Sequence, residues 1–338
     1  MVNDTPETFD CSRDPDIDRI GITQSECEAL LALYTGTDGA NWDSNSNWFS
    51  SANIDNWYGL QAVVRNNTRG SCDVEIIDII LRDNGLSGNI DDFAEKLTDL
   101  TDLEKFQVGN NVSSSSNQYN NLTGSILASW SGWTQLDHFA IDDTNIGGQL
   151  PASRSSWTNL RDFYIGGAPR ISGPLPSERA ARSALQVFSA GLNALGGEIP
   201  TSYTAWTNIE VFSVWNSELT GEIPNELVAA RSGGIQVFDV GDNNLGGEIP
   251  DLSARADTIT RFTIRQNDFY GDISRITNFT GVSDVSFQSG INLAENRFHP
   301  SSLSTATINF LDANAEPGRS GEQKYAYDLR RSSAGITD

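Results

Sequence analysis

Hydrophobic residues recur along this chain in a fixed pattern. Most units open with an aliphatic residue, have Phe three positions later, and have a second aliphatic residue two positions after the Phe. In the best-preserved stretch the opening residues follow one another at intervals of 24 to 26 residues: Leu136, Leu160, Leu185, Ile209, Ile235 and Ile259. Ile76 and Leu103 precede this series, and Val282 extends it. Repeats of this length predict a solenoid, in which each unit forms one coil.

The alternation of Phe, a variable residue and an aliphatic residue predicts a short β-strand whose Phe points to one side. One coil is too small to bury its own Phe, so neighbouring coils must do it. We therefore expect a single buried column formed by Phe106, Phe139, Phe163, Phe188, Phe212, Phe238 and Phe262.

Polar and small residues follow each strand at fixed offsets. A buried Asn is expected at the strand exit, bonded to backbone groups of its own coil and the next, at Asn84, Asn193, Asn243 and Asn267. Thr144 and Ser217 stand at this position in two other units. A second bend, where a side chain would be costly, is expected at Gly88, Gly124, Gly148, Gly173, Gly197, Gly221, Gly247 and Gly271.

The run L-x-x-F-x-I-x-x-N-x-L-x-G-x-I-P resembles the plant-type leucine-rich repeat (LRR), with Phe in place of the usual second Leu. Such repeats occur in plant receptor ectodomains, in polygalacturonase-inhibiting proteins, and in secreted or surface proteins of algae, oomycetes and bacteria. The resemblance covers residues 73 to about 298. It implies an α/β-type solenoid of about eight or nine coils with a concave parallel β-sheet, few helices and a cap at each end.

Four segments follow from the resemblance: an N-terminal extension over 1–24, an N-terminal cap over 25–72, the repeats over 73–298, and a C-terminal cap and tail over 299–338. A polar insertion of about nine residues in the second repeat, at 111–119, is expected to form a protruding loop.

The cap is expected to contain a helix. Ser25 and Glu28 have capping-box spacing, and Gly36 can end the helix. Leu30, Leu33 and Tyr34 would share its buried face. The aromatic residues that follow would cover the open edge of the first coil.

Charge excludes one class of partner. Asp and Glu number 45 against 22 Lys and Arg, which gives a formal net charge of −23. Such a chain repels phosphate backbones, so we expect no nucleic-acid partner. No stretch contains the roughly 18 apolar residues of a membrane helix, so direct membrane insertion is not expected.

Several features predict an extracellular or cell-surface protein whose signal peptide was removed or lies outside this sequence. Five glycosylation sequons are present, at Asn3, Asn66, Asn111, Asn121 and Asn278. The three cysteines Cys11, Cys27 and Cys72 allow one disulfide, and the sequence does not choose the pair. Their position near the N-terminus favours a stapled cap over a metal site.

Catalytic and metal motifs are sparse. The chain has two His, and it lacks the signatures of zinc proteases, serine hydrolases, P-loop proteins and dinucleotide-binding folds, so we expect no enzyme and no cofactor. Asp14, Asp16 and Asp18 alternate as in a calcium loop, but Arg19 and Ser25 stand where Gly and Glu are required. A surface turn is the expected structure there, with calcium as the alternative.

The concave face of the sheet is the expected binding surface. Residues that flank the buried Phe point outward there. The candidate ligand-binding residues are His138, Asp142, Tyr164, Trp215, Asp239, Asp242, Arg261 and Arg265, with Asp143 beside them.

Trp215 stands where neighbouring units have glycine. An exposed indole in this place suits an anchor for a protein loop or for the flat face of a sugar ring. Alternatively, the indole covers an apolar column made by Val187, Val211 and Val237.

The expected function is non-catalytic recognition of a protein, peptide or glycan on the concave face. Two alternatives remain: binding of cell-wall polysaccharide or inhibition of a polysaccharide-degrading enzyme, and a structural or adhesive role in a surface assembly. Ice binding occurs in a few proteins with this repeat, but no regular Thr column is present. The ligand and the oligomeric state do not follow from the sequence.

Overall fold

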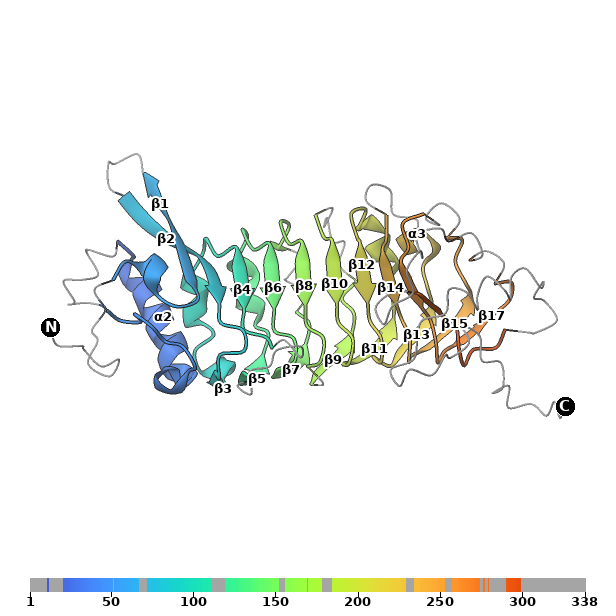
Figure 1. Ribbon diagram of the computed structural model, residues 1–338, viewed down its shortest axis with the longest axis horizontal. Coiled ribbons are helices and arrows are strands. Elements are labelled where there is room, and N and C mark those ends of the chain that lie inside the picture. Colours follow the sequence, from blue (N-terminus) through green and yellow to red (C-terminus); the bar gives the residue numbers. More distant parts are fainter. Residues whose placement is uncertain are drawn as a thin grey trace. The chain divides into compact units, whose positions relative to one another are not determined.

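The computed structural model describes residues 11, 21–50, 52–66, 72–110, 119–151, 156–168, 170–177, 184–228, 234–252, 257–273, 276, 279 and 290–298. The contacts within the chain divide it into two units, unit 1 over 1–171 and unit 2 over 172–338. Each unit contains strands of two sheets (Figure 1).

The first sheet of unit 1 has one strand per coil after an N-terminal hairpin. Its strand order is β1 (Leu60–Asn66), β2 (Cys72–Ile80), β4 (Lys105–Gln107), β6 (His138–Ala140) and β8 (Asp162–Tyr164). β1 and β2 are antiparallel, and from β2 to β8 the strands are parallel. Figure 1 shows the β1–β2 hairpin extending beyond the edge of β4. The sequence pattern did not predict this hairpin.

The first sheet of unit 2 continues the same repeat. Its parallel strands lie in the order β10 (Val187–Ser189), β12 (Val211–Ser213), β14 (Val237–Asp239), β16 (Arg261–Thr263) and β18 (Gly290–Asn292). Equivalent residues of successive coils face one another, so that Phe212 pairs with Phe238 and Phe238 with Phe262.

The return segments form a second parallel sheet. In unit 1 it contains β3 (Ser87–Asn89), β5 (Asn121–Ser125) and β7 (Asn145–Gln149). In unit 2 it contains β9 (Ile171–Pro174, whose first residue belongs to unit 1), β11 (Ala194–Glu198), β13 (Leu219–Glu222), β15 (Asn244–Glu248) and β17 (Asp268–Tyr270). Here the register is staggered, because Gly221 pairs with Leu245 and not with its equivalent Gly247. The sequence analysis did not predict this staggered sheet.

Helices are short. The only longer one among the described residues is α2 (Gln24–Gly36), and α3 (Asn225–Val228) is one turn. The 3₁₀ turns are η1 (Gly39–Asn41), η2 (Ile54–Asn56), η3 (Ile90–Asp92), η4 (Lys96–Asp99), η5 (Ala128–Gly132) and η7 (Thr201–Ala205).

The predicted phenylalanine column is confirmed in each unit. All seven Phe side chains are at most 2% exposed. In unit 1 the ring centroids of Phe106, Phe139 and Phe163 are 5.9 and 5.6 Å apart along the column. In unit 2 the centroids of Phe188, Phe212, Phe238 and Phe262 are 5.7, 5.6 and 5.7 Å apart. Offset stacking at this spacing is favourable for aromatic rings, and within each unit it joins these coils to one another.

The asparagine at the strand exit connects coils as expected, but in the opposite direction. The Asn243 side chain donates to the Val240 carbonyl of its own coil and to the Val214 carbonyl of the preceding coil. Its Oδ1 accepts from the backbone N–H groups of Ser217 and Leu219, also in the preceding coil. Asn267 repeats this pattern toward Val240. The prediction of hydrogen bonds to the next coil is therefore wrong, because the Asn side chain points toward the preceding coil.

The cap helix has the predicted buried face and ends at Gly36, but its capping box differs. Thr23, not Ser25, is the N-cap residue, and it exchanges hydrogen bonds with Glu26 at 2.8 and 3.2 Å. Both pairs have a spacing of three, so spacing alone could not distinguish them. Glu28 instead pairs with Lys96 Nζ at 2.8 Å.

A disulfide joins Cys11 to Cys27 of α2, which resolves the choice among three cysteines. Cys72 opens β2. A disulfide between a segment that precedes the helix and the helix itself matches the stapled cap expected from the cysteine positions.

The stacked Phe column predicts a large effect of removing one ring. Phe212→Ala should lower the free energy of unfolding by about 3–5 kcal/mol, because the cavity opens against two neighbouring coils at once. Urea denaturation followed by circular dichroism measures this. Phe212→Leu should cost markedly less, because Leu keeps most of the apolar volume. Equal losses for both variants would contradict the role of ring packing.

Candidate functional site

The register of the first sheet arranges outward side chains in rows that run across the strands. In unit 2 the first row is Val187, Val211, Val237, Arg261 and Gly290, and the second row is Ser189, Ser213, Asp239, Thr263 and Asn292. The third row lies two residues further along each coil and contains Gly191, Trp215, Gly241 and Arg265. These rows make up the open face of unit 2, opposite the buried Phe column.

Trp215 lies across the glycine of the preceding coil. A Cβ atom placed on Gly191 would be 2.5 Å from the indole Nε1, so the ring occupies the space that a side chain at 191 would need. The indole is half-buried, less exposed than the sequence predicted. The valine row lies four residues earlier along the coils. The alternative in which the indole covers that row stays a prediction.

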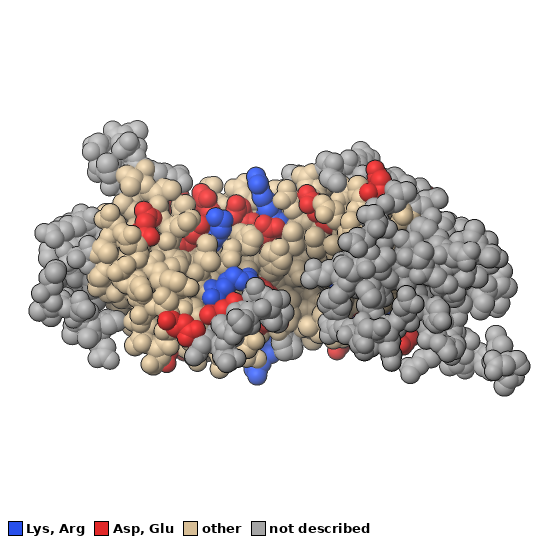
Figure 2. Space-filling model, in the orientation of Figure 1, with Lys and Arg blue, Asp and Glu red and all other residues tan. Residues whose placement is uncertain are grey.

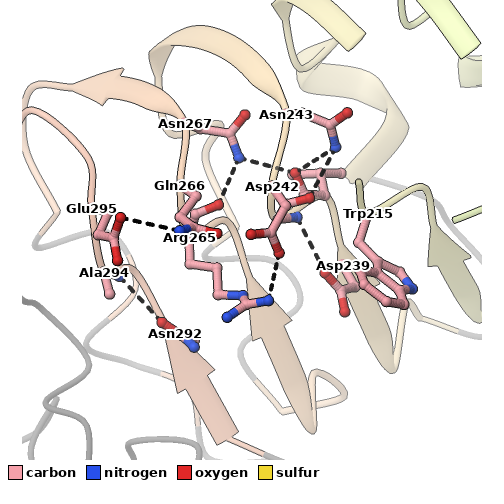
Figure 3. Close-up of polar contacts among 12 residues, drawn as sticks. Trp215, Asp239, Asp242, Asn243, Arg265, Gln266, Asn267, Asn292, Ala294 and Glu295 are labelled. Atoms are coloured by element: carbon pink, nitrogen blue, oxygen red, sulfur yellow. Dashed lines mark hydrogen bonds and ion pairs between the residues drawn. The ribbon is translucent and has the colours of Figure 1, made fainter. Parts of the chain in front are cut away.

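Charged residues on this face are held in pairs across coils. Asp239 Oδ2 is 3.0 Å from an Arg261 guanidinium nitrogen, and Asp242 Oδ2 is 2.6 Å from one of Arg265. Figure 3 shows Arg265 directed at Asp242. All five residues predicted for this part of the chain therefore share one face.

The open face of unit 1 is polar. Its first row is Asp78, Lys105, His138 and Asp162. Lys105 Nζ is 2.9 Å from the fully buried Asp78, and His138 Nδ1 is 3.0 Å from Asp162. The ring of Tyr164 lies 5.6 Å from that of His138, centroid to centroid. His138 and Tyr164 were predicted for this face, but their charged neighbours were not.

A bidentate ion pair reaches across an intervening coil in unit 1. Arg82 donates to both carboxylate oxygens of Asp142, at 3.0 and 2.7 Å, and to the Asn110 carbonyl at 2.8 Å. Gly109 is the equivalent residue of the coil between those of Arg82 and Asp142. A Cβ atom placed on it would be 2.5 Å from Asp142 Oδ1. The missing side chain at 109 therefore makes room for the Asp142 carboxylate.

Asp143 is the most perturbed acid on this face. Burial, and after it the charge of Asp142, raise the pKa of its carboxyl from 3.8 to about 6, while Arg82 opposes the shift. Its backbone is left-handed, with φ of 54°. A side chain of this kind titrates near the pH of mildly acidic surroundings.

The remaining candidates are dispersed. Asn121 is exposed at the start of β5, where its side-chain oxygen accepts from Asn145, a position open to a glycan. Asn66 ends β1. Asn3, Asn111, Asn278 and the Asp14, Asp16 and Asp18 run lie outside the described residues, as does most of the 111–119 insertion.

Among the residues that the structure describes, no group of three or more His, Cys, Asp or Glu could hold a metal ion. No helix there has the length and apolar character to cross a membrane. Figure 2 shows Lys and Arg lying beside Asp and Glu among uncharged residues.

Comparison with known proteins gives matches in structure alone. No family model and no curated protein sequence matches the chain. The LRR ectodomain of the plant membrane receptor kinase GASSHO1/SCHENGEN3 from Arabidopsis thaliana matches 81% of the chain with a TM-score of 0.61 and 22% identity. A plant ice-binding protein matches 82% with a TM-score of 0.61 and 18% identity, and PEPR1–AtPEP1 matches 82% with a TM-score of 0.57 and 19% identity.

These likenesses show the fold. The chain has the leucine-rich-repeat fold, and its solenoid resembles plant LRR ectodomains. It spans 32% of the GASSHO1/SCHENGEN3 chain and 36% of the PEPR1 complex chain, but 88% of the ice-binding protein. Identities of this size do not carry a ligand from one protein to another.

Because the pKa of the Asp143 carboxyl is raised, replacing this carboxyl by a neutral group should increase the free energy of unfolding, by an amount that depends on pH. The folded state holds this proton more tightly than the unfolded state, so stability from this group is present below about pH 4 and is lost as the pH rises to about 6. Asp143→Asn should therefore raise the free energy of unfolding by about 1 kcal/mol at pH 7, a value reduced for solvent screening. Asn tolerates the left-handed backbone.

Urea denaturation of wild type and variant at pH 7 and pH 4 measures this gain. The difference should vanish at pH 4, where the wild-type carboxyl is protonated in the folded state. A gain of the same size at both pH values would instead reflect the backbone preference of Asn and would contradict the charge argument.

Proposed function

We propose that this chain is a non-catalytic, extracellular recognition module that binds a protein or peptide through the open face of its first sheet. The observation that carries the proposal is the valine row of unit 2. Val187, Val211 and Val237 lie side by side on adjacent strands, and each is half-buried on the outward side of the sheet. Apolar side chains aligned on an otherwise polar face suit an anchor for a partner.

The chemistry of the face supports binding over catalysis. Its charged groups are engaged with partners on other coils, as in the Asp239–Arg261 and Arg82–Asp142 pairs. Pairs of this kind orient side chains and select complementary partners. The strongly negative net charge favours a basic partner over an acidic one.

The structural likeness to receptor ectodomains also supports binding of a protein or peptide. The GASSHO1/SCHENGEN3 ectodomain was solved in complex with CASPARIAN STRIP INTEGRITY FACTOR 2. Extracellular placement is supported by the sequons and by the Cys11–Cys27 disulfide, which persists in oxidising compartments. The alternatives are inhibition of a polysaccharide-degrading enzyme, which is also protein binding, and assembly with further copies of the chain.

The valine row predicts which substitution abolishes binding. Val211→Asp should weaken the affinity for the partner at least about tenfold, because it places an unpaired charge at the centre of the apolar contact. Partners are first isolated on the immobilised protein, identified and purified, and their affinities are then measured by calorimetry. Thr220→Asp is the matched control, since Thr220 is exposed on β13 of the second sheet.

Two results would contradict this proposal. If Val211→Asp and Thr220→Asp bind the purified partner equally well, the valine row is not the contact. If sedimentation shows that the chain assembles with itself through this face and Val211→Asp makes it monomeric, the assembly role replaces recognition.

A further inference from the structure

Trp215 differs from every other tryptophan of the chain. Of the eight Trp residues, seven are buried: Trp42, Trp48, Trp57, Trp130, Trp133, Trp157 and Trp206. Trp215 alone is half-buried, on the outward side of the first sheet of unit 2. Leaving a large aromatic ring in contact with water costs free energy, which would be recovered if a ligand covered the ring.

The ring is also held in a defined orientation. The indole fills the space above Gly191 on its preceding coil, where a Cβ atom would approach Nε1 to 2.5 Å. On the following coil, Gly241 is covered by Arg265, whose Cγ lies 3.1 Å from a Cβ placed there. The indole is thus supported from one side by the backbone at 191, which leaves it as a pre-oriented flat surface.

Hydrogen-bonding groups border this flat surface. Ser189 and Ser213 lie on adjacent strands, two residues and about 7 Å before the third row, and both are half-buried. Asn216, the next residue along the chain, is exposed. The nearby Asp239 is neutralised by Arg261 at 3.0 Å. A serine hydroxyl both donates and accepts, as does a hydroxyl of a sugar.

We propose that Trp215 is the stacking platform of a carbohydrate subsite that takes a neutral pyranose ring. The apolar C–H face of such a ring covers the indole, and its hydroxyls reach Ser189, Ser213 and Asn216. The net charge of −23 disfavours acidic sugars. The subsite goes beyond the proposed protein contact and does not depend on it, because the valine row lies four residues earlier along the strands.

Fluorescence isolates this subsite. Because the other seven indoles are buried, acrylamide should quench mainly Trp215. The probes are cellohexaose, laminarihexaose and a neutral galactan hexamer, with a polygalacturonate hexamer as the anionic control. At least one neutral hexamer should protect the indole from acrylamide, and the anionic hexamer should not. Trp215→Ala should remove both the accessible fluorescence and at least about tenfold of the affinity measured by calorimetry.

A matched glycine pair tests the orientation of the ring without removing it. Gly191→Ala places a methyl group where the indole lies, so it should increase acrylamide quenching and weaken sugar binding several-fold. Gly196→Ala is the control, since a Cβ there meets no atom within 4 Å, and it should change neither. Equal effects of the two substitutions would overturn the assigned role of Gly191.

The outcomes separate this subsite from the protein contact. Val211→Asp should keep the sugar affinity while it loses the protein partner. If no neutral hexamer protects Trp215, or if only a proline-rich or aromatic peptide does, the carbohydrate subsite is overturned and the protein contact remains. If Val211→Asp leaves the protein partner bound while the sugar protects Trp215, the protein contact is overturned and the subsite remains.

Discussion

The stack of one phenylalanine per coil is the constraint on which the rest of the structure depends. Within each unit the rings follow one another at 5.6 to 5.9 Å. This contact can form only if equivalent residues of adjacent strands face one another, which fixes the register of the first sheet. Since strand side chains alternate, that register also fixes the rows on the open face. The geometry of the candidate site is thus a consequence of the core.

Glycines adjust that geometry locally. In the third row, large side chains lean back over the glycine of the preceding coil: Asp142 over Gly109, Trp215 over Gly191 and Arg265 over Gly241. The position of a large side chain in this row therefore depends on the absence of a side chain at the glycine of the preceding coil. The glycines are therefore part of the site, as the large residues are. Because of Gly191, the Trp215 indole has a defined orientation, unlike an indole without neighbours on a surface.

The sequence predicted the features that depend on period and missed those that depend on side-chain direction. The Phe column follows from spacing alone, whereas the partner of Asp142 required knowing that Arg82 reaches across an intervening coil. Asn120 shows a second limit. The insertion before it breaks the offset that identified the other asparagines, yet Asn120 bonds the backbone of Asn84, Leu86 and Leu81 as a ladder member. Its spacing to Leu122, the same Asn-x-Leu as in intact coils, could have identified it.

Charge is distributed differently on the two sheets of unit 2. On the first sheet the acids Asp239 and Asp242 contact arginines of the following coil. On the second sheet Glu198 and Glu222 are exposed, and their aliphatic stems lie over Gly221 and Gly247. Like charges aligned on neighbouring strands repel, which keeps that sheet from pairing with another acidic surface. The negative charge therefore disfavours contact between the second sheet and another acidic surface. The open face of unit 2, where the acids are paired with arginines beside the valine row and the indole, is better suited to contact with a partner.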